Sequence, residues 1–162
     1  MLSYRLAIVL TMPLFLAPAV VAKDDAGDTP KQFISNWAST FNKNDTKLLL
    51  AFYDRSESTE ILVSSGFRHR GYKAVEKAYT RDQKQLRYYD SNVKEVSTRI
   101  LGNTALINFE HLFKFRVTDD DSRWQVHIRT TTVLHRIDGK WKIVLEHSSA
   151  IRGVERIVRV KD

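Results

Sequence analysis

The sequence predicts an α+β domain in which about three N-terminal helices pack against one curled antiparallel sheet. Between residues 29 and 85, apolar residues recur every three or four positions, which is the spacing of amphipathic helices. After Asn92 they alternate, which is typical of half-buried strands. Asp138-Gly139 separates two runs rich in Val, Ile and Thr, so a tight hairpin turn is expected there. Helices followed by strands within 162 residues indicate one layered domain.

The first 22 residues have the features of a secretory signal peptide. Arg5 precedes an apolar run from Leu6 to Val21, and cleavage is expected after Ala22, before a polar segment. The alternative is an uncleaved membrane anchor, which the short, proline-interrupted run disfavours. We therefore expect export to the periplasm or secretion, with no membrane association after cleavage. The expected organisation is a signal peptide at 1–22, a short linker at 23–28, a folded domain at 29–151 and a basic tail at 152–162.

The composition narrows the function classes. The chain has no Cys, which excludes disulfides, thiol nucleophiles and cysteine metal ligands. A formal net charge of +7 could attract anions, but Lys and Arg are spread over nearly every predicted element. They lack the interleaved aromatic residues of a nucleic-acid platform. We therefore interpret them as solvated faces and expect no nucleic-acid partner.

Three helices are predicted before the sheet. Thr29-Pro30-Lys31-Gln32 is a capping box with proline at the first helical position, so a helix should begin there. Asp45 can cap a second, short helix, and Gly71 precedes a third that runs to about Gln85. The apolar positions of the first helix are Phe33, Ile34, Trp37 and Phe41, and those of the second are Leu48, Leu49, Phe52 and Tyr53.

A short strand is predicted at Thr59–Ser64, before the sheet proper. Leu86–Tyr89 could extend the third helix or begin an edge strand, and the last eleven residues could form an edge strand or a loose tail. The strands of the antiparallel meander are expected at Val93–Leu101, Thr104–Val117, Arg123–Arg136 and Lys140–Ala150.

Alternation assigns the two faces of the long strands, because successive side chains point to opposite sides. The polar side chains expected on the otherwise apolar inner face are His111, Thr130, Thr132, His147 and Ser149. In the final strand, Trp141, Ile143 and Leu145 share this face, whereas Lys142 and Glu146 are expected to face away.

His111 and His147 are the two histidines predicted to face inward. Imidazole titrates near neutral pH, so either side chain could hydrogen-bond a ligand or transfer a proton. The alternative for each is a hydrogen-bonded core histidine with no further role. Two histidines without Cys or an inward carboxylate on the sheet do not make a converging ligand set. We therefore expect no metal and no cofactor.

Four segments carry a resemblance to known proteins: FNKND at 41–45, RGYKAVEKAY at 70–79, ILGNTALINF at 100–109 and TVLHRIDGKWKIVLEHSS at 132–149. Over about residues 29–150 the chain resembles the nuclear transport factor 2-like superfamily, in its SnoaL-like branch. The last segment is similar to the closing hairpin of the association domain of calcium/calmodulin-dependent kinase II. This fold hosts isomerases, dehydratases, binding modules and assembly domains, so the resemblance does not select an activity.

The resemblance implies a cone-shaped, cystatin-like fold whose curved sheet and helices enclose a pocket, with the other sheet face available for dimerisation. In ketosteroid isomerases a Tyr, an Asp base and an Asp donor act in this pocket. The matching positions here are Trp37, Leu62 and Thr130, and none can perform that chemistry. The kinase association domain carries an Arg where this chain has Thr132, which further removes charge from the site.

The leading hypothesis is an exported, non-catalytic protein that binds a small, partly apolar ligand. The expected ligand contacts are Trp37, Tyr53 and Trp124 as walls, with His111, Thr132 and His147 as polar anchors. The first alternative is an isomerase, dehydratase or hydrolase with His147 as general base. A further alternative is a homodimerisation module that uses the outer sheet face around Gln125, His127, Arg129 and Glu146.

Overall fold

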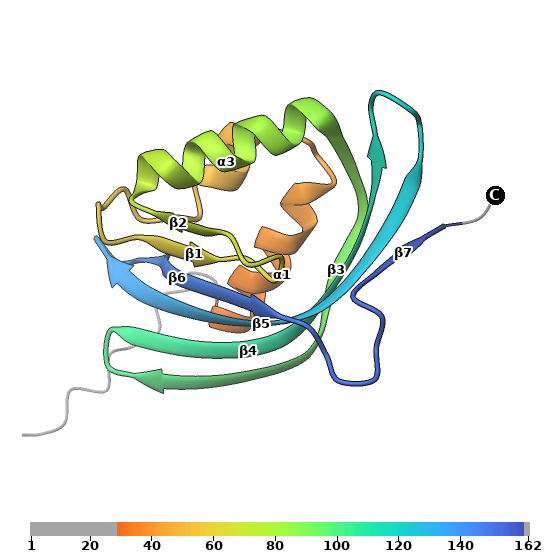
Figure 1. The fold of residues 1–162 in the computed structure, drawn as a ribbon. Helices are drawn as coiled ribbons and strands as arrows, with labels where there is room; N and C mark the ends of the chain where they lie inside the picture. Colours follow the sequence, from red (N-terminus) through yellow and green to blue (C-terminus); the bar gives the residue numbers. More distant parts are fainter. Residues whose placement is uncertain (1–28, 161–162) are drawn as a thin grey trace, which may run out of the picture.

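A strongly curved sheet wraps around the helices in the computed structural model of this protein (Figure 1), which describes residues 29–160. The predicted signal peptide lies outside the described residues. The sheet order is β2-β1-β6-β5-β4-β3, and β7 pairs with β5. The helices are α1 (Pro30–Phe41), α2 (Thr46–Leu50) and α3 (Tyr72–Gln85). The strands are β1 (Glu60–Leu62), β2 (Arg68–Arg70), β3 (Leu86–Leu101), β4 (Thr104–Val117), β5 (Arg123–Ile137), β6 (Lys140–Ser149) and β7 (Ile157–Arg159).

The predicted helix starts are confirmed, with one difference at the first. Thr29 Oγ1 accepts a hydrogen bond from the Gln32 amide at 3.2 Å, and Asp45 Oδ1 accepts one from the Leu48 amide at 3.1 Å. The Gln32 side chain does not complete the capping box, because it donates to Asn36 Oδ1 instead. The cap hydroxyl therefore satisfies one of the orphaned backbone donors of α1.

The long strands follow the predicted meander, and β3 resolves an open alternative by beginning at Leu86, directly after α3. Two register shifts bend β3 against β4, and residues with positive φ lie at both, Asp90 (54°) and Glu95 (51°). Asp138 and Gly139 both have positive φ, as the predicted hairpin turn requires. Strand β2 was not predicted, because Arg68–Arg70 has no apolar alternation.

The C-terminal tail contributes a short strand that pairs with β5 alone, which agrees with the edge-strand alternative rather than with a loose tail. Strand β6 ends at Ser149, opposite Arg129, so the first residues of β5 have a free side. Strand β7 occupies that side, with Trp124 opposite Arg159 and Val126 opposite Ile157. Figure 1 shows β7 continuing beside β5 beyond the end of β6.

A β-bulge at Val144 changes which side chains of β6 face inward. Leu134 pairs with Ile143, but its neighbour Val133 pairs with Leu145, so Val144 has no partner. One extra residue inverts the facing of everything that follows it. Trp141 and Ile143 are buried as predicted, whereas beyond the bulge Glu146 and Ser148 are buried and His147 is exposed. The predicted inward facing of Leu145, His147 and Ser149, and the outward facing of Glu146, are therefore wrong.

The hydrophobic core lies between the concave side of the sheet and the helices. Its fully buried members come from both layers, and they include Ile34, Trp37, Leu49, Ile107, Leu134 and Ile143. Burial of such side chains stabilises the fold by roughly 1.5–3 kcal/mol each. In the part of the chain that the structure describes, no helix is long and apolar enough to cross a bilayer.

Candidate functional site

A partly open cavity of about 120 Å³ lies inside the cone, between the helices and the concave sheet face. Every layer of the fold contributes to its walls. The lining residues are Trp37 and Phe41 from α1, Ile61, Val63 and His69 from the β1–β2 hairpin, Ala78, Tyr79 and Asp82 from α3, and Tyr88, His111, Phe113, Ile128, Glu146 and Ser148 from the long strands. The walls are largely apolar, with aromatic and aliphatic side chains and a few polar groups among them, which is the usual composition of a small-molecule site.

Glu146 is a buried carboxyl group in the wall of this cavity, and Tyr53 holds it while bonding two further aromatic side chains. The Tyr53 hydroxyl lies 2.6 Å from Glu146 Oε2, 2.7 Å from the Tyr79 hydroxyl and 3.1 Å from Trp37 Nε1. Tyr53 and Trp37 are almost completely buried, at 2% and 1% exposure. The carboxyl group is therefore fixed by a buried network rather than by solvent.

The network holds one of the two oxygens of Glu146. A tyrosine hydroxyl donates once and accepts twice, and the indole N–H only donates. When Glu146 is ionised, Tyr53 donates to Glu146 Oε2 and accepts from Trp37 and Tyr79, which uses all three of its positions. Oε1 makes no hydrogen bond to another described residue, and it keeps some accessible surface. Oε1 is therefore the oxygen available to a ligand.

Burial raises the pKa of Glu146 from its ordinary value of 4.5 to about 7, because an ionised carboxylate is poorly solvated there. The hydrogen bond from Tyr53 acts in the opposite direction. The pKa of Tyr53 is raised well above 10, by burial first and by the charge of Glu146 second, so the phenol keeps its proton. Glu146 therefore exchanges a proton near neutral pH, as acid–base groups do.

His111 is the second buried polar group, and it lies among aromatic rings. Its ring centroid is 4.7 Å from that of Phe113 and 5.0 Å from that of Trp37. Nε2 is 2.9 Å from Ser91 Oγ, and burial lowers the pKa of His111 to about 3. His111 is therefore a neutral hydrogen-bonding group at physiological pH.

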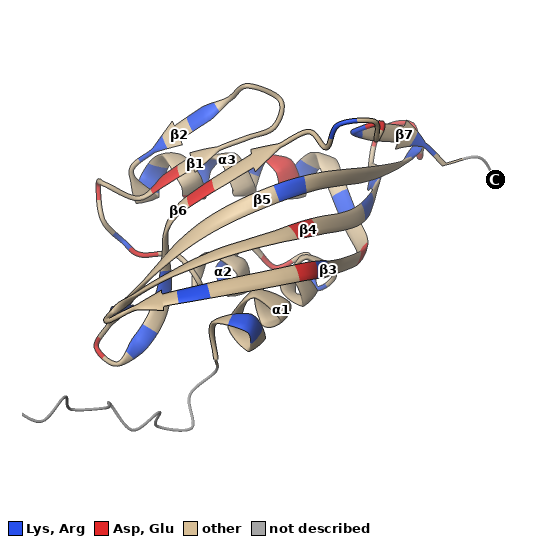
Figure 2. Ribbon diagram, turned by 90° about the horizontal axis from the view of Figure 1, so that it is seen from below, with Lys and Arg blue, Asp and Glu red and all other residues tan. Residues whose placement is uncertain are grey.

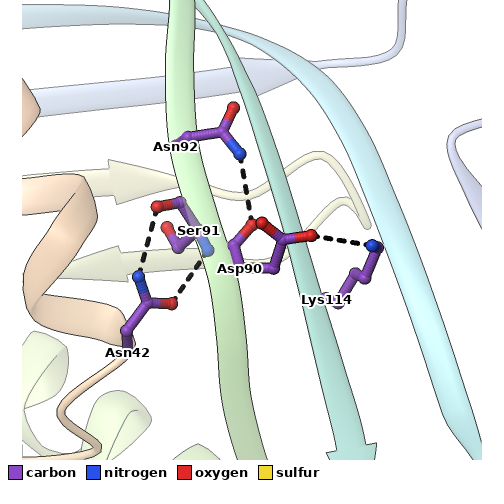
Figure 3. Close-up of polar contacts among 5 residues, drawn as sticks. All are labelled: Asn42, Asp90, Ser91, Asn92 and Lys114. Atoms are coloured by element: carbon purple, nitrogen blue, oxygen red, sulfur yellow. Dashed lines mark hydrogen bonds and ion pairs between the residues drawn. The ribbon is translucent and has the colours of Figure 1, made fainter.

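The loop after α1 fixes the position of Ser91. Asn42 Oδ1 accepts from the Ser91 amide at 2.8 Å, and Asn42 Nδ2 donates to the Ser91 carbonyl at 3.3 Å. Figure 3 shows Asn42 facing the Ser91 backbone, while Asp90 points the other way toward Lys114. The bulge in β3 thus turns Ser91 inward, to His111, and Asp90 outward.

The predicted ligand contacts are only partly brought together. Trp37 and His111 line the cavity, and Tyr53 lies directly behind it, bonded to Glu146. Thr132 is buried beside Glu146 on the neighbouring strand, but it is not part of the lining. The Trp124 indole N–H donates a hydrogen bond to Ser122 Oγ near the start of β5, and Trp124 does not line the cavity. His147 is on the outer face, so it cannot act as a base in this cavity.

The positions compared with ketosteroid isomerases are also placed by the structure. Leu62 pairs with His147, while its neighbours Ile61 and Val63 line the cavity. Thr130 is fully buried, and its hydroxyl is 3.1 Å from Ser148 Oγ. Neither strand therefore offers a carboxylate at these points.

Sequence reasoning missed the groups that give the cavity its polarity: His69, Tyr79, Asp82, Glu146 and Ser148. Tyr79 lies in the predicted third helix, and its hydroxyl gave no indication of a site. Glu146 was placed on the outer face by uninterrupted alternation. Ile143-Val144-Leu145, three apolar residues in a row, was the one sequence feature that could have indicated a bulge. No group of three or more potential metal-ligating side chains is present among residues 29–160.

Comparison with known proteins gives a family and a fold. The model of the SnoaL-like domain matches residues 31–153 of this chain. No match is found among curated proteins. A nuclear transport factor 2-like superfamily protein from Salmonella enterica serovar Typhimurium is a similar solved structure, with a TM-score of 0.64 and 22% identity; the match covers 75% of this chain and 89% of that one.

Two further solved structures share the fold at low identity. A proposed scytalone dehydratase from Novosphingobium aromaticivorans has a TM-score of 0.67 and 12% identity, over 82% of this chain and 85% of that one. A proposed calcium/calmodulin-dependent protein kinase II association domain from Xanthomonas campestris has a TM-score of 0.58 and 20% identity, over 75% and 84%. The similarity that the closing hairpin predicted is thus confirmed at the level of the fold.

Proposed function

This chain belongs to the SnoaL-like domain family, and on that premise we propose that it binds a small, partly apolar ligand in the cavity between its helices and sheet. The observation that carries the proposal is the cavity itself, since aromatic walls surround the buried polar groups Glu146 and His111. Such a combination gives a ligand both apolar burial and a defined orientation.

The volume of the cavity limits the size of the ligand. An engineered apolar cavity of about 150 Å³ in another protein holds one benzene molecule. The cavity here is about 120 Å³ and partly open, so it accommodates a single ring or a branched group of similar size, with a substituent reaching the opening. Larger ligands, such as a fused four-ring steroid, would have to remain mostly outside.

Filling the cavity tests this proposal directly. Ala78 lines the cavity on α3 and is 8% exposed, so Ala78→Leu should occupy ligand space without removing a contact. The readout is a titration with benzyl alcohol, benzylamine and benzoate, followed through the fluorescence of Trp37 in the cavity wall. Binding to the native protein and its loss in Ala78→Leu is the expected result.

Ala74→Leu is the matched control, since Ala74 is on the same helix, is half-buried and does not line the cavity. Equal affinity in the native protein and Ala78→Leu would contradict the proposal. So would a native protein that binds none of the three compounds.

Acid–base catalysis on the bound ligand is a second candidate function, and Glu146 favours it. Its pKa of about 7 allows both proton uptake and release near neutral pH, and Oε1 is the oxygen that Tyr53 does not hold. Proton removal from carbon is the step that isomerisations and dehydrations share. The Novosphingobium protein named above is a proposed dehydratase with the same fold.

A substrate-independent assay tests this candidate. The ring of 1,2-benzisoxazole opens when a base removes its C3 proton, so the molecule reports a positioned base. We expect a rate that rises through about pH 7 and falls by 10²-fold or more in Glu146→Gln. Glu110→Gln is the control, since Glu110 bonds His127 on the outer face. An unchanged rate in Glu146→Gln would exclude Glu146 as the base.

Export is part of the proposed function, and the N-terminal sequence supports it. Arg5, the apolar run that follows and the small residues before Lys23 form a secretory signal. Mass spectrometry of the protein from a periplasmic or culture-medium fraction should find a chain that begins at Lys23. Full-length protein confined to the cytoplasm would contradict export.

Dimerisation through the outer sheet face completes the proposal. Gln125, His127 and Arg129 lie on the face away from the cavity, as predicted, whereas Glu146 does not. Arg129 is exposed, so Arg129→Glu should weaken a dimer without touching the cavity. Light scattering should give a dimer mass for the native chain and a monomer mass for the variant, while a monomeric native chain would refute the dimer.

A further inference from the structure

The charge of the cavity is opposite to that of the protein. The chain has a formal net charge of +7, and Figure 2 shows its Lys and Arg spread over most elements. Among the residues that line the cavity there is no Lys or Arg, although Asp82 and Glu146 are both present. A basic protein that places carboxyl groups, and neither Lys nor Arg, around this partly open cavity has a local preference for positive charge there.

The tyrosines and His111 around Glu146 do not oppose this preference. The titratable groups that face the cavity with Glu146 are Tyr53 just after α2, Tyr79 and Asp82 on α3, Tyr88 on β3, His111 on β4 and His69 on β2. The three tyrosines keep their protons, because burial raises the pKa of each. His111 stays uncharged because burial lowers its pKa to about 3. His69 is half-buried beside the exposed Phe67 on the β1–β2 hairpin.

Glu146 is a better binding group than Asp82 for a positively charged ligand, because its charge is not compensated by a neighbouring cation in the described part of the chain. Asp82 is half-buried, and its Oδ1 lies 2.9 Å from Arg81 Nη2, so part of its charge is compensated. Glu146 has no cationic partner within residues 29–160, and its Oε1 makes no hydrogen bond there. Ser148, two residues along the same strand face, offers a hydroxyl that can accept a second hydrogen bond from the ligand.

We propose that the ligand is a small organic cation, a protonated amine attached to one ring, whose ammonium group binds Glu146 Oε1. The aromatic walls would surround the ring and attract the positive charge. This inference rests on the proposed function, since it names the class of ligand for the same cavity. It distinguishes an amine from a carboxylate or an alcohol of the same shape.

The proposal predicts the direction in which the ligand affinity changes with pH, because Glu146 must lose its proton to bind an ammonium group. An ammonium ion binds the ionised form of Glu146, whereas a neutral acceptor binds the protonated form. If only the ionised form is competent, affinity scales with its fraction. With a pKa of about 7, the affinity for the cation should be about tenfold higher at pH 8 than at pH 6. The affinity for an uncharged acceptor should change in the opposite direction.

The experiment is a calorimetric titration of the full mature chain with benzylamine, benzyl alcohol and benzoate at pH 6 and pH 8. These compounds share a ring and differ in the charge of one substituent. We expect benzylamine to bind most tightly at pH 8 and to lose about tenfold in affinity at pH 6. Glu146→Gln should lose tenfold or more for benzylamine at pH 8 and change little for benzyl alcohol.

Glu110→Gln serves as the control for bulk charge, because it removes the same charge from the outer face. Tighter binding of benzoate or benzyl alcohol at pH 8 would overturn the cation inference and leave the ligand-binding proposal intact. Benzylamine affinity that is insensitive to Glu146→Gln would do the same. Failure of all three compounds to bind would overturn both. If the Gln variant does not fold, the pH dependence in the native chain decides the question.

Discussion

Tyr53 and Glu146 are 93 residues apart in the sequence and share a hydrogen bond of 2.6 Å at the base of the cavity. Tyr53 follows α2, and Glu146 follows the bulge of β6, so the bond joins the helical layer to the sheet. The same hydroxyl also accepts hydrogen bonds from the Trp37 indole N–H and the Tyr79 hydroxyl. One phenol oxygen therefore connects the packing of three elements to the ionisation of the carboxyl group in the cavity.

Tyr53→Phe should raise the pKa of Glu146 above about 7, because it removes the hydrogen bond that stabilises the carboxylate. It also leaves the buried Trp37 N–H without its acceptor, which should cost about 1–3 kcal/mol of stability. A carbon-13 NMR titration of the Glu146 carboxyl measures the pKa. Tyr79→Phe is the comparison, since it keeps the bond from Tyr53 and should move the pKa less. A lower pKa in Tyr53→Phe would contradict the assigned donor.

Glu146→Gln should change how stability depends on pH. The folded-state pKa of about 7 lies above the ordinary value of 4.5, so the folded protein binds more protons between these values. The contribution of Glu146 is therefore fully present below pH 4.5 and is lost as pH rises to about 7, by about 3 kcal/mol. In urea unfolding, the free energy of unfolding of the Gln variant should rise relative to that of the native protein by this amount between pH 4.5 and about 7. A constant difference would refute the raised pKa.

His111→Phe should have the opposite dependence. The pKa of His111 falls from 6.5 to about 3 on folding, so acid destabilises the native state as pH drops through this window. Phenylalanine fits the same aromatic surroundings and cannot titrate, although it leaves Ser91 Oγ without its partner. The variant should therefore be less stable near pH 7 and recover relative to the native protein toward pH 3, in acid unfolding followed by circular dichroism. His135→Phe, at an exposed site on β5, provides the control.

Thr132→Val should stabilise the protein by about 1 kcal/mol. Thr132 is 1% exposed, and its hydroxyl has no hydrogen-bond partner among the described residues, so the folded state bears the cost of its desolvation. Valine keeps the shape and removes the hydroxyl.

Thr130→Val is the matched variant, because Thr130 is equally buried on the same strand face and its hydroxyl is bonded to Ser148. That substitution should destabilise by about 1 kcal/mol. Thermal unfolding of both variants compares them, and a loss of stability in Thr132→Val would show that its hydroxyl has a partner of its own.

Much of the fold was predictable because the features that specify it are local. Thr29 and Asp45 cap helices by bonding amides three residues away, and Asp138-Gly139 adopts the positive φ angles of its turn. Apolar spacing placed Trp37 correctly, and His111 was assigned to the right face because β4 has no bulge between Ala105 and His111.

The polar half of the site was not predictable from one sequence because it depends on long-range pairing. The facing of Glu146 is decided where β6 pairs with β5, and the apolar run at 143–145 does not by itself fix which residue is left unpaired. A glutamate in a strand ordinarily faces solvent, and only burial against Tyr53 gives Glu146 another role. Trp124 was placed on the correct apolar parity, but its distance along the strand from the cavity could not be read from alternation.

The extra residue at Val144 has a consequence for how this protein could diverge or be redesigned. A slip of β6 that paired Val144 with Val133 would remove the bulge, turn Glu146 to the outer surface and place His147 against the helices. Deleting Val144 would instead straighten the strand and leave Glu146 facing inward, because Leu145 would still pair with Val133. In this scaffold, the side chain that a ligand meets is determined by the register of one strand as much as by its composition.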